Sequence, residues 1–149
     1  DLAALETALR DLDVEGVVTG AIASDYQWDR INGVCQRLGL KVFSPLWRKD
    51  QLTILNDMLQ AGMKAMIVGV YSDGLDREWL GRVLDREAVD RLSSLSKAKG
   101  MNVSGEGGEY ETLVLDSPMH LLTLVPDDVR VEFSRDSGQL RIGRLTASR

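Results

Sequence analysis

Apolar residues recur along the first third of the chain at helical and strand spacing. Leucines spaced by three or four residues between positions 2 and 12 predict a helix. The run 16–22, GVVTGAI, has no polar alternation, which predicts a strand buried on both faces of a parallel sheet. A helix over 24–38, stopped by Gly39, and a strand over 40–43 follow. These segments predict a right-handed βαβ unit, which places the loop 23–26 at the sheet edge where such folds bind ligands.

The remainder of the chain predicts a second α/β layer that ends in strands. An apolar helical face precedes Gly62, residues 65–70 read as a buried strand, and a helix over 85–99 stops at Gly100. Residues 110–115 are typical of a strand. Alternating apolar positions on either side of the turn 136–138 predict a hairpin near the C-terminus.

A break at Ser44–Pro45 separates the two parts, because proline disfavours helix at the preceding residue. We therefore predict an α/β protein with two domains. Residues 1–47 form the C-terminal part of a parallel-sheet nucleotide-binding domain, and residues 48–149 form a smaller α/β domain with a β-rich end. Because the chain opens at Asp1 within a helical stripe, we expect it to be a fragment.

Composition narrows the location and the class of ligand. The net charge of −5 and the lack of clustered Lys and Arg argue against direct nucleic-acid binding. Cys35 is the only cysteine, which rules out an intramolecular disulfide and favours a reducing compartment. No apolar run reaches the roughly 20 residues of a membrane helix. We expect a cytoplasmic protein without a membrane segment.

The segment GEGGEYET, residues 105–112, concentrates the candidate chemistry. Three carboxylates, Glu106, Glu109 and Glu111, fall within six residues and repel one another unless a cation is present. Strand alternation predicts that Glu109 and Glu111 share one face, with Tyr110 and Thr112 on the other. The alternative interpretation is a solvated, glycine-rich acidic turn that leads into a strand.

A second candidate site is the start of the helix after the first buried strand. The stretch Ser24, Tyr26, Gln27 and Arg30 offers free backbone N–H groups and a positive helix end to an anion. Ser24 and Gln27 equally suit a capping box that needs no ligand.

Trp47, Tyr71 and Trp79 are candidate pocket aromatics, although core packing explains tryptophan more often. Neither a Cys/His nucleophile pair nor a metal-ligand spacing of Cys and His is present.

Four segments together resemble the diphthine–ammonia ligase family: GAIASDYQWDRINGVCQRLGL, SPLW, GVYSDGLDREWLGRVLD and GEGGEYETLVLDSP. These enzymes are ATP-pyrophosphatase-like members of the N-type α-hydrolase superfamily, with a Rossmann-like sheet. The resemblance implies an ATP-dependent ligase that joins ammonia to the carboxyl group of diphthine on translation elongation factor 2. An acyl-adenylate is the implied intermediate, with AMP and pyrophosphate released.

The resemblance also has departures. The family's N-terminal phosphate loop, of Ser-Gly-Gly-Lys-Asp-Ser type, is absent from this sequence, so we expect the fragment alone to be inactive. Ser104 stands where the family often has cysteine. The alternatives are a non-catalytic module that binds a nucleotide or the elongation factor, and a related ATP pyrophosphatase acting on RNA. The number of subunits stays open, with a homodimer as one candidate assembly.

The resemblance gives each candidate residue an expected role. Glu106 and Glu109 attract the quaternary ammonium of diphthine or ammonium itself, and Glu111 with Thr112 orients its neighbours. Tyr110 or Trp79 contacts the cation through its ring. The nucleotide and its Mg²⁺ are expected to face the stretch of Ser24, Tyr26, Gln27 and Arg30. Gly105, Gly107 and Gly108 are expected to let backbone amides approach the substrate closely.

Overall fold

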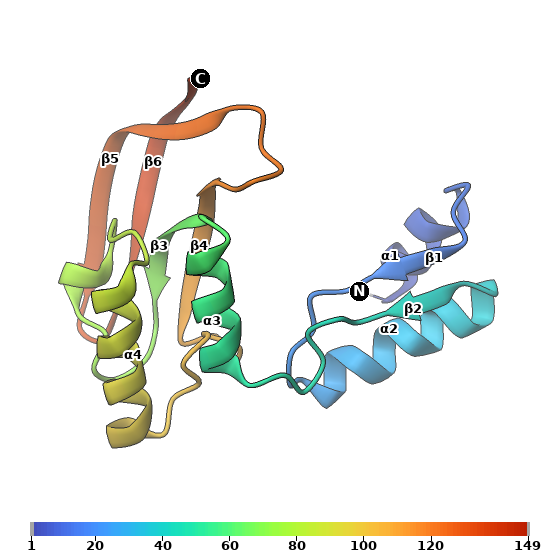
Figure 1. Cartoon of the computed structure of the whole chain (residues 1–149). Helices are drawn as coiled ribbons and strands as arrows, with labels where there is room; N and C mark the ends of the chain where they lie inside the picture. The colour runs from blue at the N-terminus through green and yellow to red at the C-terminus, as the bar shows by residue number, and fades with distance from the viewer. Residues whose placement is uncertain (1, 149) are drawn as a thin grey trace. The chain divides into compact units, whose positions relative to one another are not determined.

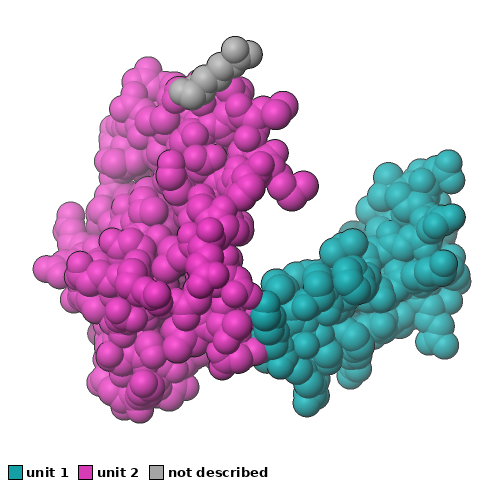
Figure 2. Space-filling view, in the orientation of Figure 1, with its two compact units in different colours: residues 1–49 teal, residues 50–149 magenta. Residues whose placement is uncertain are grey.

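A computed structural model describes residues 2–148 of the chain. The chain consists of two compact units, residues 1–49 and residues 50–149 (Figure 2). Each unit has its own sheet, and each is described by itself. No helix within residues 2–148 combines the length and the apolar character that crossing a bilayer requires.

The first unit is a βαβ arrangement preceded by a helix. It comprises α1 (Leu2–Arg10), β1 (Gly16–Val18), α2 (Asp25–Leu38) and β2 (Lys41–Phe43). The strands β1 and β2 pair in parallel, with Val17 opposite Val42, as the sequence predicts. Helix α2 begins at an N-cap, Ser24, whose hydroxyl accepts the backbone N–H of Gln27, and ends at Gly39 with φ of 70°.

The predicted strand over 16–22 is wrong in both length and burial. β1 ends at Val18, whose side chain is 73% exposed, so the strand is not buried on both faces. The later apolar residues of the run lie in a loop instead, where Ala21 is buried and the carbonyl of Ile22 accepts the N–H of Arg48 at 2.7 Å. A sheet of two short strands supplies too little cover to bury both faces. The Rossmann-like, α-hydrolase type of fold therefore stays a prediction.

The second unit is a four-stranded antiparallel sheet with two helices on one face (Figure 1). The order across the sheet is β4-β3-β6-β5. In chain order the elements are α3 (Gln51–Gln60), β3 (Lys64–Val70), the short 3₁₀ helix η1 (Arg77–Trp79), α4 (Arg86–Lys99), β4 (Tyr110–Asp116), β5 (Thr123–Ser134) and β6 (Ser137–Ser148). In this chain the C-terminal unit is the larger of the two.

Local sequence signals explain the helices of this unit. Asp50 caps α3 by accepting the N–H of Thr53, and Asp85 caps α4 by accepting the N–H of Ala88, each at 2.7 Å. Gly100 ends α4 with φ of 75°. The predicted helix and strand boundaries are confirmed here to within a few residues.

The hairpin of β5 and β6 is also confirmed, but its turn lies earlier than predicted. Ser134 pairs with Ser137, which leaves Arg135 and Asp136 as a two-residue turn in which Arg135 has φ of 56°. Ser137 and Gly138 therefore belong to β6. The pairing of Phe133 with Gly138 favours this register, because any side chain at Gly138 would meet the Phe133 ring.

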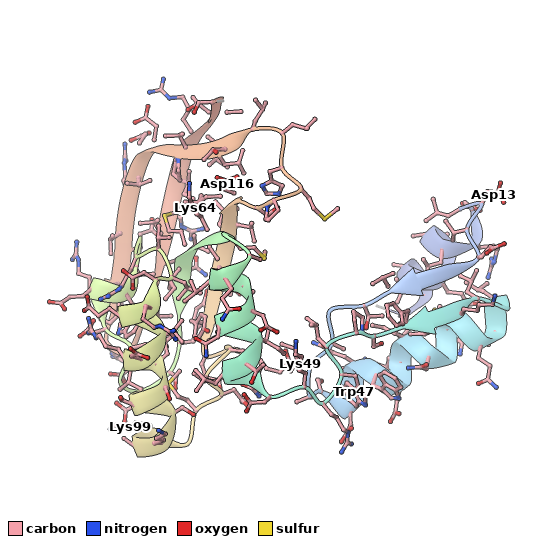
Figure 3. The ribbon with its side chains drawn as sticks, in the orientation of Figure 1. Asp13, Trp47, Lys49, Lys64, Lys99 and Asp116 are labelled. Atoms are coloured by element: carbon pink, nitrogen blue, oxygen red, sulfur yellow. The ribbon has the colours of Figure 1, made fainter. Side chains whose placement is uncertain are left out.

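The core of the second unit lies between the two helices and the sheet. Helix α4 contributes Ala88, Val89 and Leu92, and β3 contributes a nearly continuous buried run. Trp79 of η1 is the largest fully buried side chain. Where β3 begins and β4 ends, the ammonium of Lys64 lies 3.1 Å from the Asp116 carboxylate (Figure 3).

We expect Leu92→Ala to lower the free energy of unfolding by about 2–5 kcal/mol, because Leu92 is fully buried and its removal leaves a cavity. Leu121→Ala is the matched control, since that side chain is 94% exposed and its loss changes stability by less than about 0.5 kcal/mol. Urea unfolding followed by circular dichroism measures both. Equal effects of the two substitutions would contradict this placement of the core.

Candidate functional site

Residues 105–109 of the glycine-rich segment belong to the loop between α4 and β4, and the Glu109 carboxylate holds this loop together. One oxygen, Oε1, accepts the backbone N–H of Asn102 at 2.7 Å and its side-chain amide at 2.8 Å. The other, Oε2, accepts the backbone N–H of Gly107 at 2.8 Å. Glu109 thus binds groups of its own loop.

These donors set the ionisation of Glu109. Partial burial by itself raises the pKa of the carboxyl, but the hydrogen bonds from Asn102 and Gly107 outweigh it. The pKa of Glu109 therefore lies below its usual range, and the carboxylate stays charged at neutral pH. Backbone and side-chain N–H groups of the loop donate to the charged carboxylate, so Glu109 has a structural role in this loop.

The predicted glycines are required for reasons that differ from one to the next. Gly105 has φ of 75°, and a Cβ there would lie 2.9 Å from the Tyr110 carbonyl oxygen. Gly108 has φ of 83° but open space around it. A Cβ on Gly107 would meet both the Asn102 amide and the Glu109 carboxylate at 2.8 Å. The backbone therefore closes tightly around the Glu109 side chain.

Two further side chains anchor the loop to the rest of the unit. Gln51, at the start of α3, donates to the Asn102 side-chain oxygen at 3.0 Å and accepts the Ser104 hydroxyl at 2.9 Å. The Tyr110 hydroxyl, buried, donates to the Val103 carbonyl at 2.7 Å. Burial, helped by the nearby Glu109 charge, raises the pKa of Tyr110, so that it remains a neutral donor.

Gln51 and Asn102 are functional candidates that the sequence prediction missed. Nothing in the spacing of Gln51 links it to a loop more than 50 residues away. Asn102 carries a weak signal, because an asparagine shortly after a helix-ending glycine is typical of a structured turn.

The remaining predicted residues of this unit differ in their access to solvent. Glu111 and Thr112 are exposed on β4, and Glu106 is half-buried in the loop. Glu111 accepts a hydrogen bond from the Tyr71 hydroxyl at 3.2 Å. Trp79 is only 1% exposed and packs in the core, with the Arg91 guanidinium 4.8 Å from its ring centroid. Trp79 and Tyr110 are therefore core side chains of the second unit.

The second candidate site lies at the start of α2 in the first unit. The Ser24 hydroxyl accepts the backbone N–H of Gln27 at 3.3 Å, which is the N-cap half of the predicted capping box. The Arg30 guanidinium lies over the Tyr26 ring, 3.7 Å from its centroid, and Tyr26 is 64% exposed. All four predicted residues are thus grouped on the first turns of one helix.

Two hydroxyls beside this corner are further candidates. Thr19 follows β1 and Ser44 follows β2, and their side-chain oxygens lie 2.8 Å apart in a hydrogen bond. Both stand at the carboxyl edge of the parallel strands, where open α/β sheets bind ligands. Ser44 directly follows the predicted strand 40–43, which is a signal in the sequence, whereas Thr19 falls inside the strand predicted over 16–22 and carries no such signal.

The two candidate sites belong to different units. Glu106, Glu109 and Glu111 come from the second unit, and Ser24, Tyr26, Gln27 and Arg30 come from the first. Within residues 2–148, no three His, Cys, Asp or Glu side chains gather closely enough to hold a metal ion.

We expect Glu109→Gln to destabilise the second unit by about 1–3 kcal/mol, because the amide presents N–H groups to backbone donors that need an acceptor. The low pKa of Glu109 in the folded state means that its stabilisation is present above about pH 4.3, the unfolded value, and is lost as the pH falls through the folded value. The difference between wild type and variant therefore shrinks in acid.

Glu111→Gln is the control for this measurement, since the exposed amide side chain keeps an oxygen for the Tyr71 hydroxyl and the substitution costs less than about 0.5 kcal/mol. Urea unfolding at a series of pH values compares the variants. A Glu109→Gln protein as stable as wild type at pH 7 would show that the carboxylate does not hold the loop.

Comparison with known proteins relates both units to one family. A sequence model of the diphthamide synthase C-terminal domain matches residues 50–147, and one of the diphthamide synthase N-terminal domain matches residues 1–42. A diphthine–ammonia ligase of Schizosaccharomyces pombe is 49% identical over 119 residues, which cover 80% of this chain and 20% of that protein.

Two mammalian proteins that are also named diphthine–ammonia ligase are similar to this chain. The Homo sapiens protein is 42% identical over 120 residues, covering 80% of this chain and 45% of the relative. The Mus musculus protein is 42% identical over 139 residues, covering 89% and 52%. The chain spans about half the length of these mammalian relatives. With the C-terminal model matching about two thirds of its residues, the chain belongs to the diphthamide synthase family.

Proposed function

We propose that this chain provides part of an ATP-dependent ligase that converts diphthine on translation elongation factor 2 to diphthamide in the cytosol. Membership of the diphthamide synthase family and the names of the relatives support the proposal. In the reaction, the diphthine carboxylate attacks the α-phosphorus of ATP and pyrophosphate leaves. Ammonia then attacks the acyl carbon of the adenylate, which forms the amide and releases AMP and a proton.

The observation that carries this proposal is the internally satisfied loop that leads into β4, the strand on which Glu111 lies. The Glu109 side chain, Gln51 and the Tyr110 hydroxyl fix the loop without any ligand. Preorganised loops of this kind place reactive groups without a cost of ordering at the time of binding. Glu111 is the second residue of β4, so its backbone is held by regular structure.

The contacts of the three glutamates suggest a division of labour among them. Glu109 positions the loop, because its oxygens already accept three N–H groups. Glu111 is exposed, and within residues 2–148 its carboxylate accepts only the Tyr71 hydroxyl, so it is the group we assign to the cationic reactant. Glu106, Thr112 and the backbone of Gly105, Gly107 and Gly108 are assigned to further contacts with the substrate.

The first unit is proposed to contact the nucleotide. The start of α2 offers N–H groups and a positive helix end, and the hydroxyls of Thr19 and Ser44 stand at the carboxyl edge of the neighbouring strands. This donor set suits a phosphate or the carboxylate that is activated. Mg²⁺ would reach the protein bound to the ATP phosphates, since residues 2–148 gather no set of acidic ligands.

A chimera tests this function in a cell. The segment of the S. pombe relative that matches this chain is replaced by the corresponding residues of this chain. We expect the chimera to restore diphthamide on elongation factor 2 in a strain that lacks its own ligase, as measured by mass spectrometry of the modified peptide. A chimera that accumulates normally and binds AMP but leaves only diphthine would support a non-catalytic binding module instead.

In the same chimera, we expect Glu111→Gln to slow diphthamide formation about tenfold or more, because a charge aimed at the cationic reactant is lost. Glu87→Gln is the matched control, since Glu87 is exposed and contributes only a surface ion pair with Arg82. If the Glu111→Gln chimera formed diphthamide as fast as the unsubstituted chimera, Glu111 would not belong to the site.

A further inference from the structure

A groove of about 500 Å³ lies beside the turn between β5 and β6 in the second unit. Its lining includes two aromatic residues, Tyr71 and Phe133, together with Arg77, Glu132 and Gln139. None of the glycine-rich loop residues lines it. Tyr71 nevertheless links the groove to the start of β4, which follows that loop, because its hydroxyl donates to Glu111.

The Tyr71 ring is fixed in place by a glycine and two hydrogen bonds. A Cβ on Gly69 would lie 2.7 Å from the Tyr71 hydroxyl oxygen and 3.0 Å from the ring, so the ring lies over the bare backbone of β3. Gly69 pairs with Glu111 on one side and with Gln139 on the other. Gln139 donates to the hydroxyl at 2.8 Å, and the hydroxyl donates to Glu111 at 3.2 Å.

Two opposite charges near the groove lack an ion-pair partner among residues 2–148. Glu111 forms no ion pair there, and neither does Arg77, whereas Glu132 is neutralised by Arg141 at 2.9 Å. An exposed carboxylate beside an aromatic ring attracts a cation, and a free guanidinium attracts a carboxylate. The surroundings of Tyr71 are thus complementary to a molecule that carries both charges.

We propose that this groove binds a quaternary ammonium group together with the carboxylate attached next to it. The Tyr71 ring receives the methylated nitrogen, the Glu111 charge next to the Tyr71 hydroxyl attracts it from outside the lining, and Arg77 receives the carboxylate. A quaternary nitrogen has no N–H to donate, so it gains from an aromatic face and a nearby charge and needs no hydrogen-bond acceptor. The inference deepens the proposed function, on which it rests for the natural ligand, diphthine.

The test uses the chain by itself, with glycine betaine as the probe. Titration followed by NMR should show saturable shifts at Tyr71 and Phe133. The isostere tert-butylacetate, which keeps the carboxylate but has an uncharged tert-butyl group in place of the quaternary ammonium, should bind about tenfold more weakly or worse. Equal binding of the two probes, or the absence of saturable shifts with betaine, would overturn the proposal.

Three variants separate the contributions. Tyr71→Leu should weaken betaine about tenfold, and Tyr71→Phe, which keeps the ring, should weaken it only a few-fold. Arg77→Gln should weaken betaine but leave tetramethylammonium unchanged, because that probe has no carboxylate. Betaine binding by Tyr71→Leu at wild-type strength would refute the aromatic contact. If Tyr71→Leu loses its dispersed NMR spectrum, Arg77→Gln and the isostere still decide the question.

The outcome is independent of turnover, because the titration contains no ATP, ammonia or elongation factor. Betaine binding with an inactive chimera would leave the groove as a quaternary ammonium site and remove the ligase function. An active chimera without betaine binding would keep the ligase and place its cation elsewhere.

Discussion

The hydrogen bonds to Glu109 are the interaction on which the candidate site of the second unit depends. Its side chain accepts three N–H groups from Asn102 and Gly107, and its backbone carbonyl accepts the N–H of Tyr71 at 2.8 Å. One residue therefore closes the loop through its side chain and places Tyr71 through its backbone. The geometry of the loop and that of the groove are coupled through this residue.

Such an arrangement requires a backbone with almost no side chains near the carboxylate. Gly107 must be bare because Glu109 and Asn102 occupy the space of its Cβ, and Gly105 must be bare because Tyr110 does. The glycines are thus needed for the loop to fold upon itself. In the sequence interpretation they allowed a ligand to approach, and both uses of a bare backbone are compatible at Gly108, where space is open.

Sequence reasoning predicted the elements that depend on local signals and erred where burial depends on distant cover. Helices α2 and α4 follow from caps such as Ser24 and Asp85 and from the glycines that end them. The first strand was predicted too long, because an apolar run such as 16–22 packs equally well as a loop. Whether the side chain of Val18 is buried depends on which strands pack beside β1, and the residues around Val18 carry no information about those strands.

The same limit applies to the site. Strand alternation correctly separates Tyr110, which is buried, from Glu111, which is exposed, but it has no means to reveal that Glu109 turns back to bind Asn102. The hydrogen bonds of Glu109 need N–H donors from the surrounding loop, and the conformation of that loop is not determined by any single residue. Gly69 carried a usable signal, because a lone glycine within an apolar strand is typical of close approach by another group.

The hydrogen bonds of Glu109 change the electrostatic hypothesis that the sequence suggested. Three carboxylates within six residues predict strong attraction for a cation, but Glu109 is already stabilised by N–H donors and needs no counter-ion. In the proposed site, the attraction for an external cation is assigned to Glu111, a single exposed charge. In water one such charge is weak and strongly screened, so selectivity must come from a second feature. In the proposed site this feature is the neighbouring ring of Tyr71, because an aromatic face favours a poorly hydrated cation over a small, well-hydrated one.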